Sequence, residues 1–171
     1  MSCNCNKNGK TVLNSILVSG VSTATSQVYA LDFTHWLCGN RKICINSSYP
    51  LSGLINFNVV DIVSLGQNTW NVSIGYTGQV TYLPFVRGCN PCCDPCPKTD
   101  FIFGQFTVPV NSATAPTVTL STTGANVVVS PANVEDCCNI TNAVEIETVL
   151  TVSTGAVAAA LEENPLITAK K

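Results

Sequence analysis

The chain has 171 residues, a formal charge of −2 and only 11% charged residues, against about 25% in typical globular proteins. Its eight Lys and Arg residues are scattered along the chain, which argues against a basic face for nucleic-acid binding. No apolar run approaches the ~18 residues of a membrane span and the N-terminus has no apolar signal segment, so we expect no membrane partner and a chain that starts in the cytoplasm.

The first ten residues, MSCNCNKNGK, differ from the rest of the chain. They are polar and would bury no core, so residues 1–10 are expected to form a flexible arm. Ten extended residues reach at most ~35 Å, which is enough to touch a neighbouring subunit. Cys3 and Cys5 could therefore tether one chain to the next, and a clip from the arm to its own domain is the alternative.

Residues 11–154 are expected to form one domain of β-strands. Stretches such as TWNVSIGY and FIFGQFTVPV alternate apolar with small or polar residues, which is the period of a sheet with one buried face. The predicted strands are 11–19, 27–33, 42–46, 53–64, 69–76, 79–86, 100–110, 117–121, 126–130 and 143–153. Many short strands at this spacing predict an all-β, antiparallel β-sandwich, with jelly-roll or immunoglobulin-like topology unresolved.

One segment is expected to be helical. GAVAAALEEN at 155–164 is rich in helix formers, and Pro165 ends it. Residues 155–171 are therefore predicted to be a short C-terminal helix with a tail.

A proline-rich cysteine cluster, GCNPCCDPCPKTD, lies between two predicted strands. Its thiols suggest a metal site, redox chemistry or cross-linking. A structural zinc site uses four ligands that usually come from two knuckles well apart in sequence, whereas here one ion would have to be wrapped by eight residues with three prolines. A reactive CxxC needs a helix N-terminus that lowers the thiol pKa, and no such helix is predicted. No metal or other cofactor is therefore expected.

Adjacent cysteines occur twice, at Cys92–Cys93 and at Cys137–Cys138. Neighbouring residues do not readily bond to each other, because an unstrained disulfide needs Cα atoms about 4.4–6.8 Å apart and neighbours are about 3.8 Å apart. Each pair is therefore expected to face two partners, in one chain or in two.

The ten cysteines fall into two groups of disulfide candidates. Cys38 and Cys44 flank the turn GNRK and could close a local loop. The intrachain candidates are Cys38, Cys44, Cys89 and Cys96. The interchain candidates are Cys3, Cys5, Cys92, Cys93, Cys137 and Cys138. Connectivity cannot be deduced from spacing alone.

No catalytic site is predicted, and the protein is not expected to be an enzyme. His35 is the sole histidine, and its aromatic neighbourhood in DFTHWLC favours an ordinary packed or surface side chain over a ligand. Glu145 and Glu147 share a face of a predicted strand, where a solvated face is the simpler interpretation. The chain has no phosphate-binding glycine motif.

The cysteine-bearing arm (SCNCN), the absence of a signal segment, the two CC pairs and the low-charge Val/Thr/Asn-rich domain together resemble subunits of endospore appendages of Bacillus-type bacteria. More loosely, they resemble cysteine-rich spore coat and exosporium proteins. The resemblance implies a jelly-roll-like domain that stacks into a fibre, with Cys3 and Cys5 bonded to another subunit. The chain is longer than is typical of those subunits, and its vicinal cysteines lie inside the domain.

We therefore expect a structural, self-assembling subunit of a disulfide-cross-linked extracellular or spore-surface assembly, in the form of a fibre, ring or coat lattice. Its partners would be copies of itself and other spore-surface proteins, and it would assemble from the mother-cell cytoplasm without a signal peptide. The alternative is a metal-binding or redox module that uses Cys89, Cys92, Cys93 and Cys96.

Overall fold

The computed structural model describes residues 9–23, 25–37, 43, 51–84, 97–122, 128–132 and 142–155. The described residues form strands and no helix, hence no helix long and apolar enough to cross a membrane. The strands are β1 (Lys10–Thr23), β2 (Ser26–Trp36), β3 (Ser52–Gly66), β4 (Thr69–Tyr82), β5 (Lys98–Asn111), β6 (Val118–Thr122), β7 (Val128–Ala132) and β8 (Ala143–Thr154). The predicted all-β, antiparallel architecture is confirmed.

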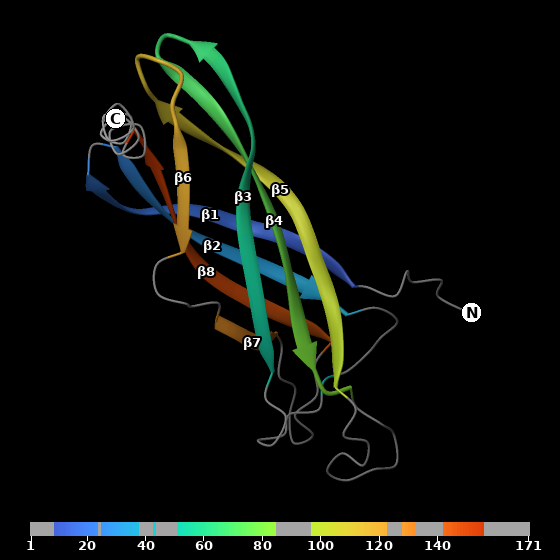
Figure 1. Ribbon diagram of the computed structural model, residues 1–171. Coiled ribbons are helices and arrows are strands. Elements are labelled where there is room, and N and C mark those ends of the chain that lie inside the picture. The colour runs from blue at the N-terminus through green and yellow to red at the C-terminus, as the bar shows by residue number, and fades with distance from the viewer. Residues whose placement is uncertain are drawn as a thin grey trace, which may run out of the picture.

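Two antiparallel sheets make up the described part of the chain (Figure 1). One has the order β1-β2-β8-β6, and β7 also pairs with β8 beyond the end of β6. The other contains the three consecutive strands β3-β4-β5. Five of the strands have 12 residues or more, whereas strands usually have 3–10.

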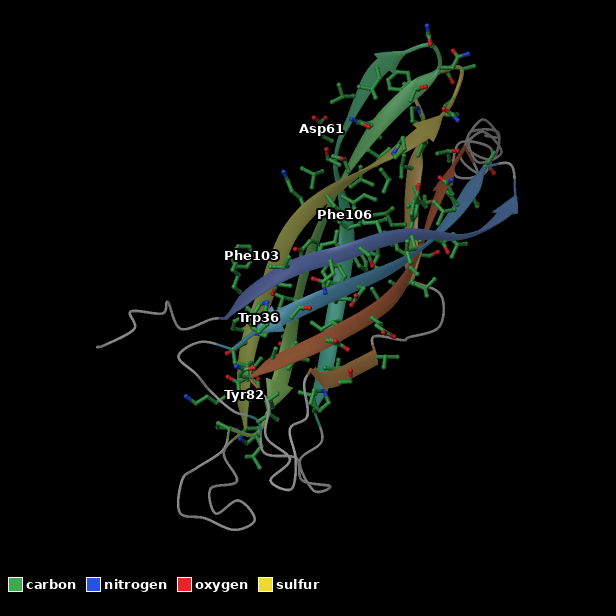
Figure 2. The ribbon with its side chains drawn as sticks, turned by 180° about the vertical axis from the view of Figure 1, so that it is seen from behind. Trp36, Asp61, Tyr82, Phe103 and Phe106 are labelled. Atoms are coloured by element: carbon green, nitrogen blue, oxygen red, sulfur yellow. The ribbon has the colours of Figure 1, made fainter. Side chains whose placement is uncertain are left out.

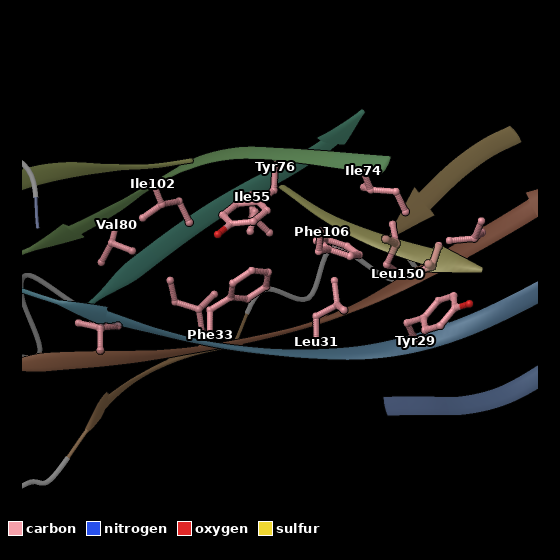
Figure 3. Close-up of a cluster of buried hydrophobic side chains, with 14 of the residues drawn as sticks. Tyr29, Leu31, Phe33, Ile55, Ile74, Tyr76, Val80, Ile102, Phe106 and Leu150 are labelled. Atoms are coloured by element: carbon pink, nitrogen blue, oxygen red, sulfur yellow. The ribbon is translucent and has the colours of Figure 1, made fainter. Parts of the chain in front are cut away.

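The hydrophobic core lies between the two sheets (Figure 3). In β5, Ile102, Phe106, Val108 and Val110 are buried, and the residues that alternate with them are mostly exposed. Leu31 and Phe33 of β2 face the same core from the other sheet. Alternation buries one face of β2 and of β5, and the packing of the two sheets follows from that pattern.

Aromatic side chains join the two sheets at the centre of this core. The ring of Tyr76 on β4 lies edge-on to that of Phe33 on β2, with 5.0 Å between the ring centroids. Gly104 on β5 is paired with Tyr76, and a Cβ at this glycine would meet the Tyr76 hydroxyl and ring. Burial raises the pKa of Tyr76, and also that of Tyr29 on β2, above the ordinary value of 10.0.

Two expectations about the strands need correction or stay open. The predicted strand 69–76 and the first residues of the predicted strand 79–86 form one strand, β4, which runs through Gly78 without a turn and ends at Tyr82. A Cβ at Gly78 would meet the carbonyl oxygen of Leu54, so this glycine allows β3 to approach closely instead of marking a break. In the predicted strand 42–46 only Ile43 is described, in an isolated bridge with Pro84. The predicted helix lies outside the described residues, apart from Gly155.

Candidate functional site: the cysteine-bearing end of the two sheets

The segments that carry cysteines all leave from one end of the two sheets. We call this the cysteine end and define it by the described residues that flank those segments. They are Gly9, Leu37, Ile43, Leu51, Pro84, Pro97, Ala132 and Asn142. The ten cysteines themselves lie outside the described residues, so the proposed pairings stay predictions.

Strand register brings these flanking residues together. Trp36 pairs with Lys10 on one side and with Ala143 on the other, which places the starts of β1 and β8 beside the end of β2. The backbone N–H of Leu37 donates to the carbonyl oxygen of Asn142 at 3.0 Å. In the second sheet Tyr82 pairs with Lys98.

Chain length limits how far the cysteines can lie from this end. Each is within six residues of a flanking residue, and six extended residues span at most about 20 Å. Cys38, Cys44 and Cys96 directly follow or precede Leu37, Ile43 and Pro97 in the sequence. All segments that carry the ten cysteines thus leave from one end of the sheets, although the sequence distributes the cysteines from position 3 to position 138.

The opposite end of the sheets has connections without cysteine. Gln67 and Asn68 form the turn between β3 and β4, both with positive φ (52° and 62°), which is typical of a tight hairpin. Residues 112–117 connect β5 to β6 at that end, where the N–H of Ser112 donates to the carbonyl oxygen of Asn68 at 2.8 Å. The cysteine-bearing segments therefore leave from one end of the domain, and the connections at the other end contain no cysteine.

A buried polar cluster lies close to the cysteine end and joins the two sheets. His35 of β2 is completely buried, and its Nε2 lies 3.1 Å from Asp100 Oδ2 of β5. The hydroxyl of Tyr82 on β4 donates to the same carboxylate oxygen at 3.4 Å. On the other side of the imidazole, Thr11 Oγ1 of β1 lies 2.9 Å from Nδ1. Four strands thus contribute to one hydrogen-bonded group.

Hydroxyl, imidazole and carboxylate in this order resemble a nucleophilic relay. The imidazole has no exposed surface, and a Cβ at Gly9 would meet its ring and the carbonyl oxygen of Trp36. The N-terminal segment therefore lies directly against His35, and a substrate has no approach to the ring. We interpret the cluster as a polar connection between the sheets at the position where residues 9 and 10 enter the domain.

The carboxylates singled out from the sequence lie elsewhere. Glu145 and Glu147 are exposed on the outer face of β8, as expected, and Asp32 of β2 is paired with Glu147. Asp32, Glu147 and the exposed Leu17 help to line a hollow of about 450 Å³ on this face. Among the described residues no group of three or more His, Cys, Asp or Glu side chains could hold a metal ion.

Sequence reasoning missed the role of Asp100 and underestimated the burial of His35. Both belong to the alternating set of their strand that faces the core, in the patterns TDFIF and LDFTHW. One histidine and one aspartate at inward positions of two strands would have indicated a buried pair. The pattern does not show that β2 and β5 face each other across the core.

Comparisons with protein-family models, with curated proteins and with solved structures found no match for this chain.

Proposed function

We propose that this protein is a structural subunit that assembles with copies of itself into a disulfide-cross-linked structure on a spore surface or outside the cell. The observation that carries the proposal is the gathering of all cysteine-bearing segments at one end of a domain whose strands contain no cysteine. Thiols placed within the domain would favour internal cross-links, whereas thiols grouped at one end are well placed to join a second copy.

The composition of the surface supports the same proposal. Charged residues are 11% of the chain, and large apolar side chains such as Leu17, Leu65 and Phe103 are more than half exposed. Soluble monomers rarely expose large contiguous apolar patches. Covalent bonds between copies would make dissociation of such an assembly very slow.

We further propose that the two sheets are a β-sandwich of the kind found in self-assembling surface proteins. The consecutive order β3-β4-β5 and the insertion of β8 between β2 and β6 describe its connectivity. A jelly-roll-like topology stays a prediction.

Gel electrophoresis and negative-stain microscopy of the same purified sample test the function. We expect fibres, rings or sheets that survive boiling in detergent and collapse to an 18.0 kDa band only when reductant is added. A single monomer band without reductant, from a sample that contains no assemblies, would contradict the proposal.

A metal-binding or redox module is the second candidate, because ten thiols at one end could also ligate an ion. Metal analysis of the same sample separates the two. Stoichiometric zinc or iron retained after purification, together with the absence of cross-linked species, would favour this alternative.

A further inference from the structure

The edge strands of the two sheets differ in how well they are protected against pairing with another chain. Natural edges are protected by bulges, charges, prolines or short length. The ladder between β1 and β2 has three register shifts. The ladder between β3 and β4 has two, and β3 also carries the exposed Asp61. β6 and β7 have five residues each.

β5 lacks two of these protections, because it is neither bulged nor short. It pairs with β4 over 14 residues without a register shift, and no other strand in the described part of the chain pairs with its second edge. Its charged residues are Lys98, at the start of the strand, and Asp100, which is buried. Among the described edge strands, β5 is therefore the longest one whose ladder has no register shift.

Two neighbouring outward side chains of β5 are large and apolar. Phe101 is 57% exposed and Phe103 is 71% exposed, the highest value among the exposed large hydrophobic residues. Figure 2 shows Phe103 at the outer margin of β5, whereas Phe106 points towards the core. Burial of such rings is a large source of favourable free energy in interfaces.

Pro109 shows which backbone groups face the free edge of β5. Proline is accepted in a regular sheet where its missing N–H would point away from the neighbouring strand, and the ladder with β4 passes through Pro109 without a shift. The odd-numbered residues of β5 therefore direct their N–H and C=O groups to the free edge, because these groups alternate along a strand.

Two prolines bound this edge symmetrically. Pro97 precedes Phe103 by six residues and Pro109 follows it by six. If two copies of β5 pair antiparallel about Phe103, the two prolines lie opposite each other, and no donor within the ladder is missing. Thr99 then pairs with Thr107 and Phe101 with Gln105, giving about ten backbone hydrogen bonds, two for each of five pairs.

We propose that β5 is a two-fold self-association edge, at which two copies of this chain pair through residues 98–108 centred on Phe103. The two three-stranded sheets become one sheet of six strands. Phe103 of one copy contacts Phe103 of the other, and Phe101 lies diagonally next to it. The inference deepens the proposed function, because it names the surface by which copies recognise each other before any disulfide forms.

The antiparallel pairing has a consequence for assembly. Lys98 lies at the cysteine end of β5, so the cysteine ends of the two paired copies point in opposite directions. Each pair then carries thiols at both of its ends. A two-fold contact by itself joins only two copies. Disulfides that link the cysteine end of one pair to the cysteine end of the next pair extend such pairs into a linear chain.

The test uses the reduced full-length chain, so that disulfides cannot contribute. An 11-residue edge is about 37 Å long and buries less than a standard interface, so we expect a dimer whose population rises with concentration in sedimentation velocity. F103K and F103E should each raise the dissociation constant by about tenfold or more, because like charges then face each other at the two-fold axis.

An equimolar mixture of F103K and F103E should restore the dimer, since residue 103 meets its own counterpart only in the proposed register. L54K is the matched control, because Leu54 is 52% exposed on the outer face of a different edge strand, β3, and this variant should dimerise like the wild type. Thermal unfolding of each variant verifies the fold.

A reduced wild type that stays monomeric at all concentrations, or an F103K chain that dimerises normally, would overturn the inference. Disulfide-linked species in the oxidised sample would then still support the proposed function. Conversely, a reduced dimer without cross-linking on oxidation would support the β5 contact and refute the disulfide-linked assembly.

Discussion

At the scale of single residues, the contact between His35 and Asp100 is the polar element of an otherwise apolar interface between the sheets. The imidazole has no exposed surface and the carboxylate side chain only 2%, so both depend on neighbouring protein groups for hydrogen bonding. A buried polar group costs free energy unless it is paired. The pair therefore favours one alignment of β2 against β5, and with it the position at which residue 9 passes over the imidazole.

Removal of one partner should be costly. We expect D100A to lower the free energy of unfolding by about 3–5 kcal/mol, because the imidazole of His35 and the hydroxyl of Tyr82 lose their shared acceptor in the core. Urea denaturation measures the change. E145A removes an exposed carboxylate from β8 and should stay within about 0.5 kcal/mol of the wild type; equal effects of the two variants would contradict this role for Asp100.

At the scale of elements, the sheet of β3, β4 and β5 combines long strands with a close approach of backbones. Gly78 and Gly104 lie on β4 and β5 at positions where a side chain would collide with the neighbouring strand or its ring. Glycine usually weakens a strand. In this sheet it is required, because β3 lies against Gly78 and Tyr76 lies over Gly104.

The close approach of β3 at Gly78 can be tested by adding one methyl group to this residue. We expect G78A to destabilise the domain by about 3 kcal/mol, because the added Cβ meets the backbone of Leu54, which cannot move without disturbing the β3–β4 ladder. T77A changes the adjacent exposed residue and should cost less than about 1 kcal/mol. A thermal melt in which the two variants coincide would show that β3 can shift freely.

At the scale of the whole molecule, the domain is asymmetric along its strands and across its sheets. The cysteine-bearing segments leave from one end, hairpin turns lie at the other, and the regular β5 edge lies along one side. An end and a side are independent surfaces, so cross-linking through cysteines and pairing through β5 do not compete. This separation allows copies of one small domain to assemble into a chain.

Alkaline pH should unfold the whole molecule through its buried tyrosines. Burial raises the pKa of Tyr29 and Tyr76 above 10.0, so the folded chain retains two phenolic protons that the unfolded chain loses. Their contribution to stability is fully present below about pH 10, where both states are protonated. It is lost as the pH rises through the higher pKa values of the folded state.

Urea denaturation at a series of pH values checks this prediction. The Y29F/Y76F double variant should lose less stability than the wild type between pH 9 and about pH 11, since phenylalanine has no proton to lose. Identical pH profiles of the two proteins would mean that the buried tyrosines do not determine alkaline unfolding.

The sequence by itself determined the class of the fold and most of its strands. The alternation in β5, and the burial of Leu31 and Phe33 in β2, follow from a local period of two, which a single chain segment carries without its neighbours. The largest error, a break after Tyr76, arose because Gly78 looks like a turn signal when the close approach of β3 is not known.

Only the tertiary structure decided which segments meet. Strand order brings residues 9, 37, 84, 97 and 142 to one end, although up to 133 positions separate them along the chain. It also places Asp100 against His35 and leaves the second edge of β5 without a partner among the described strands. Local periodicity specifies which face of a strand is buried, but the pairing of strands depends on long-range contacts that no short stretch of sequence contains.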